Sequence, residues 1–124
     1  MYEIAVVQHF DAAHFLREYH GKCEALHGHR YQVIVKIQAP ALDNTGLAYD
    51  FTELKKHLRN IIDRFDHACL NDLPPFDNIN PSAENIATNI YQELKPKIAA
   101  TVSLTAIEVW ETPDNRATYF PDLR

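Results

Sequence analysis

Two segments with helical periodicity follow one another at the centre of this 124-residue chain, and β-rich segments flank them on both sides. The first helix is expected to begin at Asp50, which forms a capping box with Glu53, and to end near Asp66. The second begins within residues 80–82, which leaves its capping residue open, and Pro96 weakens its last turn. Apolar residues recur at helical spacing in both: Phe51, Leu54, Leu58, Ile61, Ile62 and Phe65, then Ala83, Ile86, Ala87, Ile90, Leu94 and Ile98.

Four β-rich segments complete the chain: residues 2–15, 31–37, 102–111 and 117–120. Apolar residues alternate with polar ones in the second segment, and those of the first share one parity from Ile4 to His14, as in strands with one buried face. The order strand, strand, helix, helix, strand, strand predicts an α+β fold in which a four-stranded antiparallel sheet carries both helices on one face. We expect one domain over residues 1–124, with two open sheet edges that must be short, charged or paired with another subunit.

The composition excludes several classes of protein. The three glycines are not placed to form a phosphate-binding loop, which excludes a P-loop or a dinucleotide fingerprint. A net charge of −5 argues against nonspecific nucleic-acid binding, although it allows a small anionic substrate. The longest aliphatic run, Ile4–Val7, is too short to span a membrane, no signal-like segment follows Met1, and the two cysteines do not suggest disulfides. These features predict a cytoplasmic protein without a membrane or nucleic-acid partner.

Seven histidines are the unusual feature of the composition, and three of them fall at predicted strand ends. His27 and His29 flank Gly28 and point to the same side of an extended segment. His14 ends the preceding strand on its apolar face, so a hairpin between the two strands would bring the three imidazoles together. Three neutral imidazoles with an open fourth position are the ligand set of a catalytic zinc site. The spacing therefore favours a metal site over three unrelated histidines in turns and strand ends.

Cys23 lies in a polar loop, four residues before His27. The preceding Lys22 and a bound cation would both favour its thiolate, which could act as a base or a nucleophile. The adjacent carboxylate of Glu24 would oppose that ionisation. The second cysteine, Cys69, is interpreted as an inert apolar residue.

Three further residues could take part in chemistry. Asp66 and His67 follow the first predicted helix, where a carboxylate can orient an imidazolium, or where the histidine only caps the helix in solvent. Glu111 ends the third β-rich segment with the parity of Ile107 and Val109. Its carboxylate therefore either faces inward toward a ligand or partner, or projects into solvent beyond the strand.

Short motifs occur in a fixed order along nearly the whole chain: Phe10-Asp11-Ala12-Ala13-His14, Cys23-x-x-x-His27-Gly28-His29, Asp50-Phe51, Leu54, Asp66-His67, Leu70-Asn71-Asp72, Pro81-Ser82-Ala83-Glu84-Asn85 and Glu111-Thr112. Together they closely resemble the family of 6-pyruvoyltetrahydropterin and 6-carboxytetrahydropterin synthases. The resemblance implies the tunnelling fold, in which subunits join their sheets edge to edge into a trimeric barrel. Two trimers then stack as a hexamer, an assembly that would cover the open sheet edges.

The resemblance also implies a role for each candidate residue. A zinc ion would be held by His14, His27 and His29. Cys23 would be the base that abstracts a proton from the substrate. Asp66 and His67 would be its partner acid–base pair, reaching the site from a neighbouring subunit. Glu111 would hold the guanidine-like edge of a pterin.

The three residues between Cys23 and His27 resemble the spacing of the carboxytetrahydropterin synthases of queuosine biosynthesis, whereas the pyruvoyl-forming enzymes usually carry a longer insertion there. The implied activity is that of a zinc-dependent lyase that converts 7,8-dihydroneopterin triphosphate to 6-carboxy-5,6,7,8-tetrahydropterin, acetaldehyde and triphosphate. Arg17, Lys22 and Arg30 are candidates for the triphosphate only because they lie near the motifs in sequence.

Three alternatives remain open at the level of sequence. A 6-pyruvoyltetrahydropterin synthase would use the same metal and substrate without carbon–carbon cleavage. A third subtype carries glutamate in place of the cysteine, and Glu24 lies beside Cys23. A noncatalytic metal-binding domain would keep the three histidines but leave the other candidate residues without a shared purpose.

Overall fold

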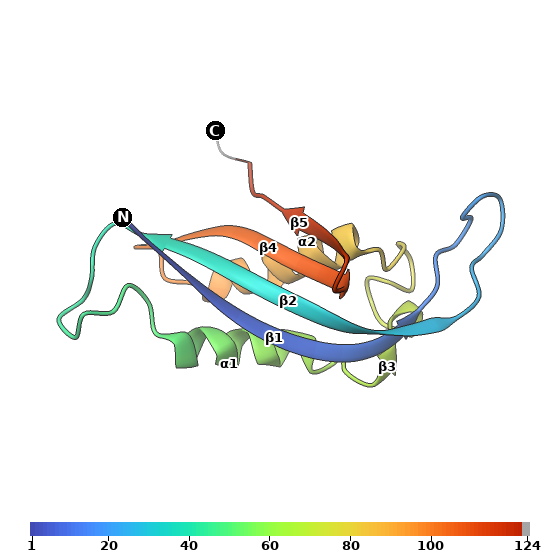
Figure 1. Ribbon diagram of the computed structural model, residues 1–124, viewed down its shortest axis with the longest axis horizontal. Coiled ribbons are helices and arrows are strands. Elements are labelled where there is room, and N and C mark those ends of the chain that lie inside the picture. Colours follow the sequence, from blue (N-terminus) through green and yellow to red (C-terminus); the bar gives the residue numbers. More distant parts are fainter. Residues whose placement is uncertain (123–124) are drawn as a thin grey trace.

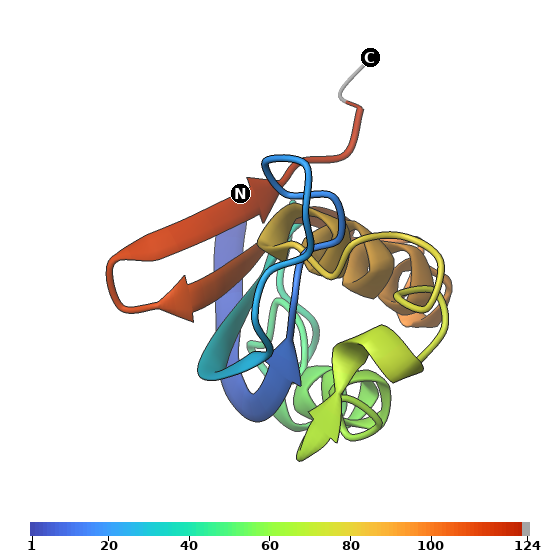
Figure 2. The same ribbon diagram turned by 90° about the vertical axis from the view of Figure 1, so that its right-hand side faces the viewer.

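The computed structural model describes residues 1–122, in which two helices lie on one face of a twisted sheet (Figures 1 and 2). Two long antiparallel strands, β1 (Tyr2–His14) and β2 (His27–Ala39), pair along their whole length. The helices α1 (Phe51–Ile62) and α2 (Ala83–Leu94) follow, and a second hairpin closes the fold. The remaining elements are β3 (Ala68–Cys69), β4 (Ser103–Thr112), β5 (Asn115–Tyr119) and the 3₁₀ turns η1 (Leu70–Asp72) and η2 (Lys95–Lys97).

The order of strands in the sheet is β3-β1-β2-β4-β5. The antiparallel strands β1, β2, β4 and β5 and the two helices on one face confirm the predicted α+β fold. A fifth strand, β3, was not predicted, because its two residues are too few to show an alternating pattern. It pairs parallel with β1 only at Ala12 and Ala13. The outer edge of β1 from Tyr2 to Asp11 therefore has no strand partner among residues 1–122.

Both helices begin with a side-chain cap. The Asp50 carboxylate accepts a hydrogen bond from the backbone N–H of Thr52 at 2.8 Å, which confirms Asp50 as the N-cap of α1. This bond goes to the second helical residue and not to Glu53, the partner that the predicted capping box requires. The cap of α2, which the sequence left open, is Ser82, whose hydroxyl accepts from the backbone N–H of Asn85 at 3.2 Å. Pro96 lies in the 3₁₀ turn η2, in agreement with the predicted weakening of the last helical turn.

The predicted end of the first helix near Asp66 is wrong, because α1 ends at Ile62 and a series of turns follows. Phe65 nevertheless continues the apolar pattern, since its side chain is fully buried and its ring lies 5.6 Å from that of Phe76. The turns thus bring Phe65 back to the core without helical geometry. The helical spacing of apolar residues in the sequence therefore continues past Ile62, the last residue of α1. No helix among the described residues is long and apolar enough to cross a membrane.

The hydrophobic core lies between the helices and the alternating side chains of β1 and β2. On β2 every second residue from Tyr31 to Ile37 is at most 1% exposed, as the alternation predicts. On β1 Phe10 is buried and stacks on Tyr31, with ring centroids 4.8 Å apart. The same buried row ends at His14, which is only 2% exposed. The core therefore leads directly into the histidines at the end of the hairpin.

Candidate metal centre and active site

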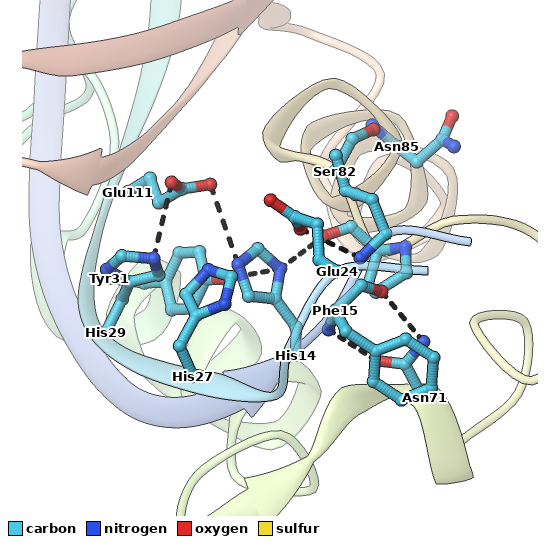
Figure 3. Close-up of polar contacts among 12 residues, drawn as sticks. His14, Phe15, Glu24, His27, His29, Tyr31, Asn71, Ser82, Asn85 and Glu111 are labelled. Carbon is cyan, nitrogen blue, oxygen red and sulfur yellow. Dashed lines mark hydrogen bonds and ion pairs between the residues drawn. The ribbon is translucent and has the colours of Figure 1, made fainter. Parts of the chain in front are cut away.

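His14, His27 and His29 meet where β1 ends and β2 begins (Figure 3). The antiparallel register places His14 opposite His27 and Ala12 opposite His29. The three ring centroids lie 4.7 to 5.3 Å apart, and one ligand atom from each histidine lies within 4.8 Å of the other two. The structure thus brings together the three residues that the sequence selected, and the group could hold a metal ion.

Backbone carbonyl groups select the tautomer of two of these histidines. The Nδ1 atom of His14 lies 2.9 Å from the carbonyl oxygen of Pro81, and that of His27 lies 2.8 Å from the carbonyl oxygen of Ala25. Because a carbonyl oxygen can only accept a hydrogen bond, each Nδ1 carries the proton. Each Nε2 is therefore left with its lone pair, the form in which a histidine binds a metal.

The donor set fits a zinc ion. The Nε2 atoms of His14 and His29 are buried and make no hydrogen bond to any described residue, and a buried nitrogen without a partner is unfavourable. Burial lowers the pKa of His29, and the opposing effect of Glu111 does not reverse the shift. The imidazole is therefore kept neutral, as metal binding requires. Three neutral imidazoles of this kind are typical of zinc sites with an open fourth position.

Glu111, near the end of β4, faces the histidines and not the solvent beyond the strand (Figure 3). Its carboxylate oxygens lie 3.3 Å from Nε2 of His29 and 3.8 Å from Nε2 of His14. The side chain is 30% exposed, so it borders both the group of three histidines and the surface. Of the two alternatives that the sequence left open, the inward orientation is therefore the observed one.

Asp66 and His67 form a second cluster at the edge of the sheet. The Asp66 carboxylate accepts a hydrogen bond from the backbone N–H of Asp11 at 2.9 Å and lies 3.1 Å from Nδ1 of His67. The bond from Asp11 and the contact with His67 hold the pKa of Asp66 below its usual value. The backbone N–H of His67 in turn donates to the Asp11 carbonyl oxygen at 2.6 Å. The two predicted partners are thus an oriented carboxylate–imidazole pair.

His67 has a φ angle of +58°, in the left-handed region that residues other than glycine rarely adopt. Its side chain is 78% exposed and does not belong to the group of three histidines. Both clusters border one shallow surface hollow, which is lined by Asp11, Gly28, His29 and His67. Within one chain, the Asp66–His67 pair therefore lies beside the group of three histidines and is not part of it.

Cys23 lies in the loop between β1 and β2, and its thiol is exposed and free. The structure does not place it in the group of three histidines. The neighbouring Glu24 is engaged by the backbone, because its carboxylate accepts from the N–H of Leu16 at 2.9 Å. The N–H of Glu24 also donates to the Leu16 carbonyl at 2.9 Å. Glu24 thus fastens the loop, whereas Cys23 keeps a free side chain. Cys69, on β3, is half-buried.

Residues without an assigned role surround the site. The Tyr31 hydroxyl lies 3.0 Å from Nδ1 of His14, and burial raises the pKa of Tyr31, so it remains a neutral phenol beneath the histidines. The sequence showed Tyr31 only as a member of the apolar row. Pro81 and Asn71 belong to the recognised motifs, but their contacts join segments 56 to 67 residues apart and leave no local signature.

Comparison with known proteins supports the interpretation of the motifs. The 6-pyruvoyl tetrahydropterin synthase family model matches residues 3–122. A 6-carboxy-5,6,7,8-tetrahydropterin synthase of Rickettsia conorii is 33% identical over 124 residues, covering 85% of this chain and 90% of that protein. Another, from Synechocystis, is 36% identical over 116 residues, covering 90% and 87%. The structure of Caenorhabditis elegans 6-pyruvoyl tetrahydropterin synthase superposes with a TM-score of 0.82 at 25% identity, covering 98% and 96%.

The sheet, the two helices and the histidine group at the end of the hairpin therefore define a protein of the tunnelling-fold class. More narrowly, the chain belongs to the 6-pyruvoyl tetrahydropterin synthase family, which confirms the resemblance seen in its motifs.

Proposed function

We propose that this protein is a 6-carboxytetrahydropterin synthase, a cytoplasmic zinc-dependent lyase of queuosine or 7-deazapurine biosynthesis. Its substrate is 7,8-dihydroneopterin triphosphate, and its products are 6-carboxy-5,6,7,8-tetrahydropterin, acetaldehyde and triphosphate. The observation that carries the proposal is that three imidazoles able to bind a metal ion lie together beside the Glu111 carboxylate. The relatives of this chain include 6-carboxy-5,6,7,8-tetrahydropterin synthases.

His14, His27 and His29 hold one zinc ion through their Nε2 atoms. When bound, zinc supplies a Lewis acid beside the side-chain hydroxyls of the substrate, which makes the adjacent C–H bond more acidic. The Glu111 carboxylate binds the guanidine-like edge of the pterin through a charge-assisted hydrogen bond, which sets the orientation of the ring. The position of Glu111 beside His14 and His29 supports this role. A substrate bound next to the proposed zinc ligands would also lie within reach of the Glu111 carboxylate, which can accept hydrogen bonds from the pterin.

Proton transfer is divided between two clusters. Cys23, as a thiolate, accepts the proton from the carbon of the substrate side chain. His67 returns a proton elsewhere on the substrate, and Asp66 orients its imidazole through the 3.1 Å contact with Nδ1. The exposed thiol and the exposed imidazole agree with groups that meet a substrate entering from solvent.

The active form is a homo-oligomer, a hexamer made of two trimers, in which Asp66 and His67 serve the site of a neighbouring subunit. Two observations support this assembly. The acid–base pair lies outside the histidine group of its own chain. In addition, β1 has an edge without a strand partner from Tyr2 to Asp11 among the described residues, and an edge of this kind favours pairing between subunits.

A 6-pyruvoyltetrahydropterin synthase is the second candidate, because the C. elegans enzyme of that name shares the fold closely. The three-residue spacing between Cys23 and His27 favours the carboxy-forming enzyme. A noncatalytic metal-binding domain is the third candidate, and it leaves the oriented Asp66–His67 pair without a purpose.

The mass of the product separates these candidates. Purified protein with stoichiometric zinc is incubated with 7,8-dihydroneopterin triphosphate, and the products are analysed by mass spectrometry. We expect the carboxy product together with acetaldehyde. A pyruvoyl product without acetaldehyde would establish the second candidate, and the absence of turnover by the zinc-loaded protein would establish the third.

Elemental analysis tests the assignment of the ligands. We expect one zinc per chain in the wild type and loss of zinc in His29→Ala. Cys23→Ala should keep its zinc but lose turnover, whereas Cys69→Ala is the matched control and should keep both. Full zinc occupancy in His29→Ala would refute the site, and loss of zinc in Cys23→Ala would make Cys23 a ligand instead of a base.

A further inference from the structure

Arg17, three residues after His14, uses its guanidinium to bind backbone carbonyl oxygens. Its Nη2 donates to the carbonyl oxygen of Phe76 at 2.7 Å and to that of Asn71 at 3.4 Å, and its Nη1 donates to that of Ile79 at 3.2 Å. One acceptor, Asn71, lies in η1, and the other two lie in the segment that joins η1 to α2. The guanidinium is therefore committed to this segment, and it is a poor candidate for the triphosphate contact suggested by its place in the sequence.

Two asparagine side chains join the same two segments. The Asn71 amide accepts from the N–H of Phe15 and donates to its carbonyl oxygen, both at 3.0 Å (Figure 3). The Asn80 amide does the same for Arg17, accepting at 2.8 Å and donating at 3.1 Å. Each side chain thus replaces the pairing that a neighbouring strand would give. Together, Arg17, Asn71 and Asn80 form a clamp between residues 15–17 and residues 71–80.

The clamp ends next to a group that contacts a metal ligand. Asn80 directly precedes Pro81, whose carbonyl oxygen lies 2.9 Å from Nδ1 of His14. On the other side, Asn85 donates to the Asn80 carbonyl at 2.8 Å, and Ser82 caps α2. The Pro81 carbonyl is therefore held between the clamp and the start of a helix. His14, which contacts this carbonyl, immediately precedes the clamped residues 15–17.

We infer that Arg17 is a positioning residue: through the clamp it holds the Pro81 carbonyl against His14, which sets the tautomer and orientation of that ligand. This inference rests on the zinc site of the proposed function. A hydrogen-bond partner behind a metal-bound histidine fixes the ring and raises its basicity, and loss of such a partner weakens metal binding by about 10- to 100-fold. Here the Pro81 carbonyl that contacts His14 is kept in place by the Arg17 side chain, which comes from the loop that follows His14.

The test compares Arg17→Gln and Arg17→Lys with the wild type. Arg64→Gln is the matched control, because Arg64 binds Asn89 and Glu93 on α2 and not the clamp. The zinc dissociation constant is measured by competition with a chromogenic chelator. The tautomer of His14 is measured by ¹⁵N NMR of the metal-free protein in alkaline buffer. The KM for 7,8-dihydroneopterin triphosphate is measured at saturating zinc.

We expect Arg17→Gln to bind zinc about tenfold more weakly, Arg17→Lys to show an intermediate loss, and Arg64→Gln to match the wild type. His14 in Arg17→Gln should also lose its uniform Nδ1–H tautomer, while KM at saturating zinc stays unchanged. An unchanged zinc affinity and tautomer in Arg17→Gln would overturn the inference. So would a KM that rises in Arg17→Gln and recovers in Arg17→Lys with normal zinc affinity, since Arg17 would then bind the triphosphate.

These results also separate this inference from the function on which it rests. If the wild type binds zinc and the Arg17 variants bind it equally well, only the clamp is refuted. If the wild type itself binds no zinc, the proposed function fails, and the role of Arg17 toward a metal ligand fails with it. Arg17→Lys retains a charged donor, so it provides the measurements if Arg17→Gln does not fold.

Discussion

His14 belongs at once to the hydrophobic core and to the candidate metal centre. Its ring ends the buried row of β1, above Phe10 and Ala12, and is only 2% exposed. Its Nδ1 contacts the Pro81 carbonyl and the Tyr31 hydroxyl, so the position of the ring is set by groups inside the protein. A ligand fixed in this way is ordered before the metal arrives, which reduces the entropy lost on binding.

The carboxylate of Asp66 should make a pH-dependent contribution to stability. Its pKa in the folded state is lowered, chiefly by the hydrogen bond from the Asp11 N–H. The ionised form therefore stabilises the fold above the unfolded-state pKa of about 3.9, and this contribution is lost as the pH falls through the lower folded-state value. We expect Asp66→Asn to have a lower free energy of unfolding than the wild type near neutral pH, and the difference to shrink below about pH 4.

Urea unfolding at a series of pH values measures this difference. Asp77→Asn is the control, because Asp77 is exposed and its substitution changes the net charge by the same amount. A difference between wild type and Asp66→Asn that stays constant down to the acid limit would show that the carboxylate does not act through its ionised form.

At the scale of the elements, the two helix caps differ in what lies next to them. Ser82 caps α2 directly after Pro81, whose carbonyl contacts His14. Asp50 caps α1 at the end of the loop that follows β2. A comparison of the two caps therefore separates the stability of a helix from the order of the metal centre.

We expect Ser82→Ala and Asp50→Ala each to lower the free energy of unfolding by about 1 kcal/mol, since each loses a capping bond. Only Ser82→Ala should also weaken zinc binding, because its loss releases the segment that carries the Pro81 carbonyl. Denaturant unfolding of the metal-free variants and a zinc competition titration measure the two effects. Equal zinc affinities in the two variants would show that the helix start does not hold the ligand in place.

Alternation and helical spacing were sufficient to predict most of the fold. On β1 the side chains of Val6, Phe10, Ala12 and His14 are buried, and on β2 so is every second residue from Tyr31 to Ile37, because a strand with one covered face has a period of two. Strand β3 could not be found this way, since two residues carry no period. The end of α1 was misplaced because Phe65 is buried from a turn, and burial alone does not distinguish a turn from a helix.

The three histidines of the candidate site could be predicted from the sequence, but the residues that hold them in position could not. The shared parity of His27 and His29, and the place of His14 at a strand end, indicated the metal group from local pattern alone. Arg17 and Asn80 contact segments more than 60 residues away, through bonds between side chains and backbone. Contacts of this kind depend on how loops meet in the folded chain, so no periodicity reveals them.

At the scale of the whole molecule, the open edge of β1 and the separate Asp66–His67 cluster have one common explanation in the proposed assembly. In that assembly, pairing of the edge with another subunit would give the open part of β1 a strand partner, and would bring the Asp66–His67 pair to the histidine group of a neighbouring subunit. The hollow lined by His29 and His67 of the same chain is the alternative, in which one subunit is sufficient.

Mixed oligomers decide between these arrangements. Cys23→Ala and His67→Ala homo-oligomers should both be inactive. When the two are unfolded and refolded together, some shared sites contain a wild-type Cys23 and a wild-type His67, so a minority of the wild-type activity should return. A turnover assay after mass spectrometry has verified the mixing measures the recovery. Mixed oligomers without any recovered activity would place all the acid–base groups within one chain.

The left-handed backbone conformation of His67 lowers the stability of the fold, but the proposed reaction requires the imidazole at this position. With φ at +58°, a residue with a Cβ atom is disfavoured by about 1 kcal/mol or more relative to glycine. A laboratory selection for heat resistance would therefore enrich His67→Gly, which relaxes the turn. We expect this variant to melt at a higher temperature and to turn over no substrate. Stabilising the protein at this position without loss of activity would show that the imidazole is dispensable.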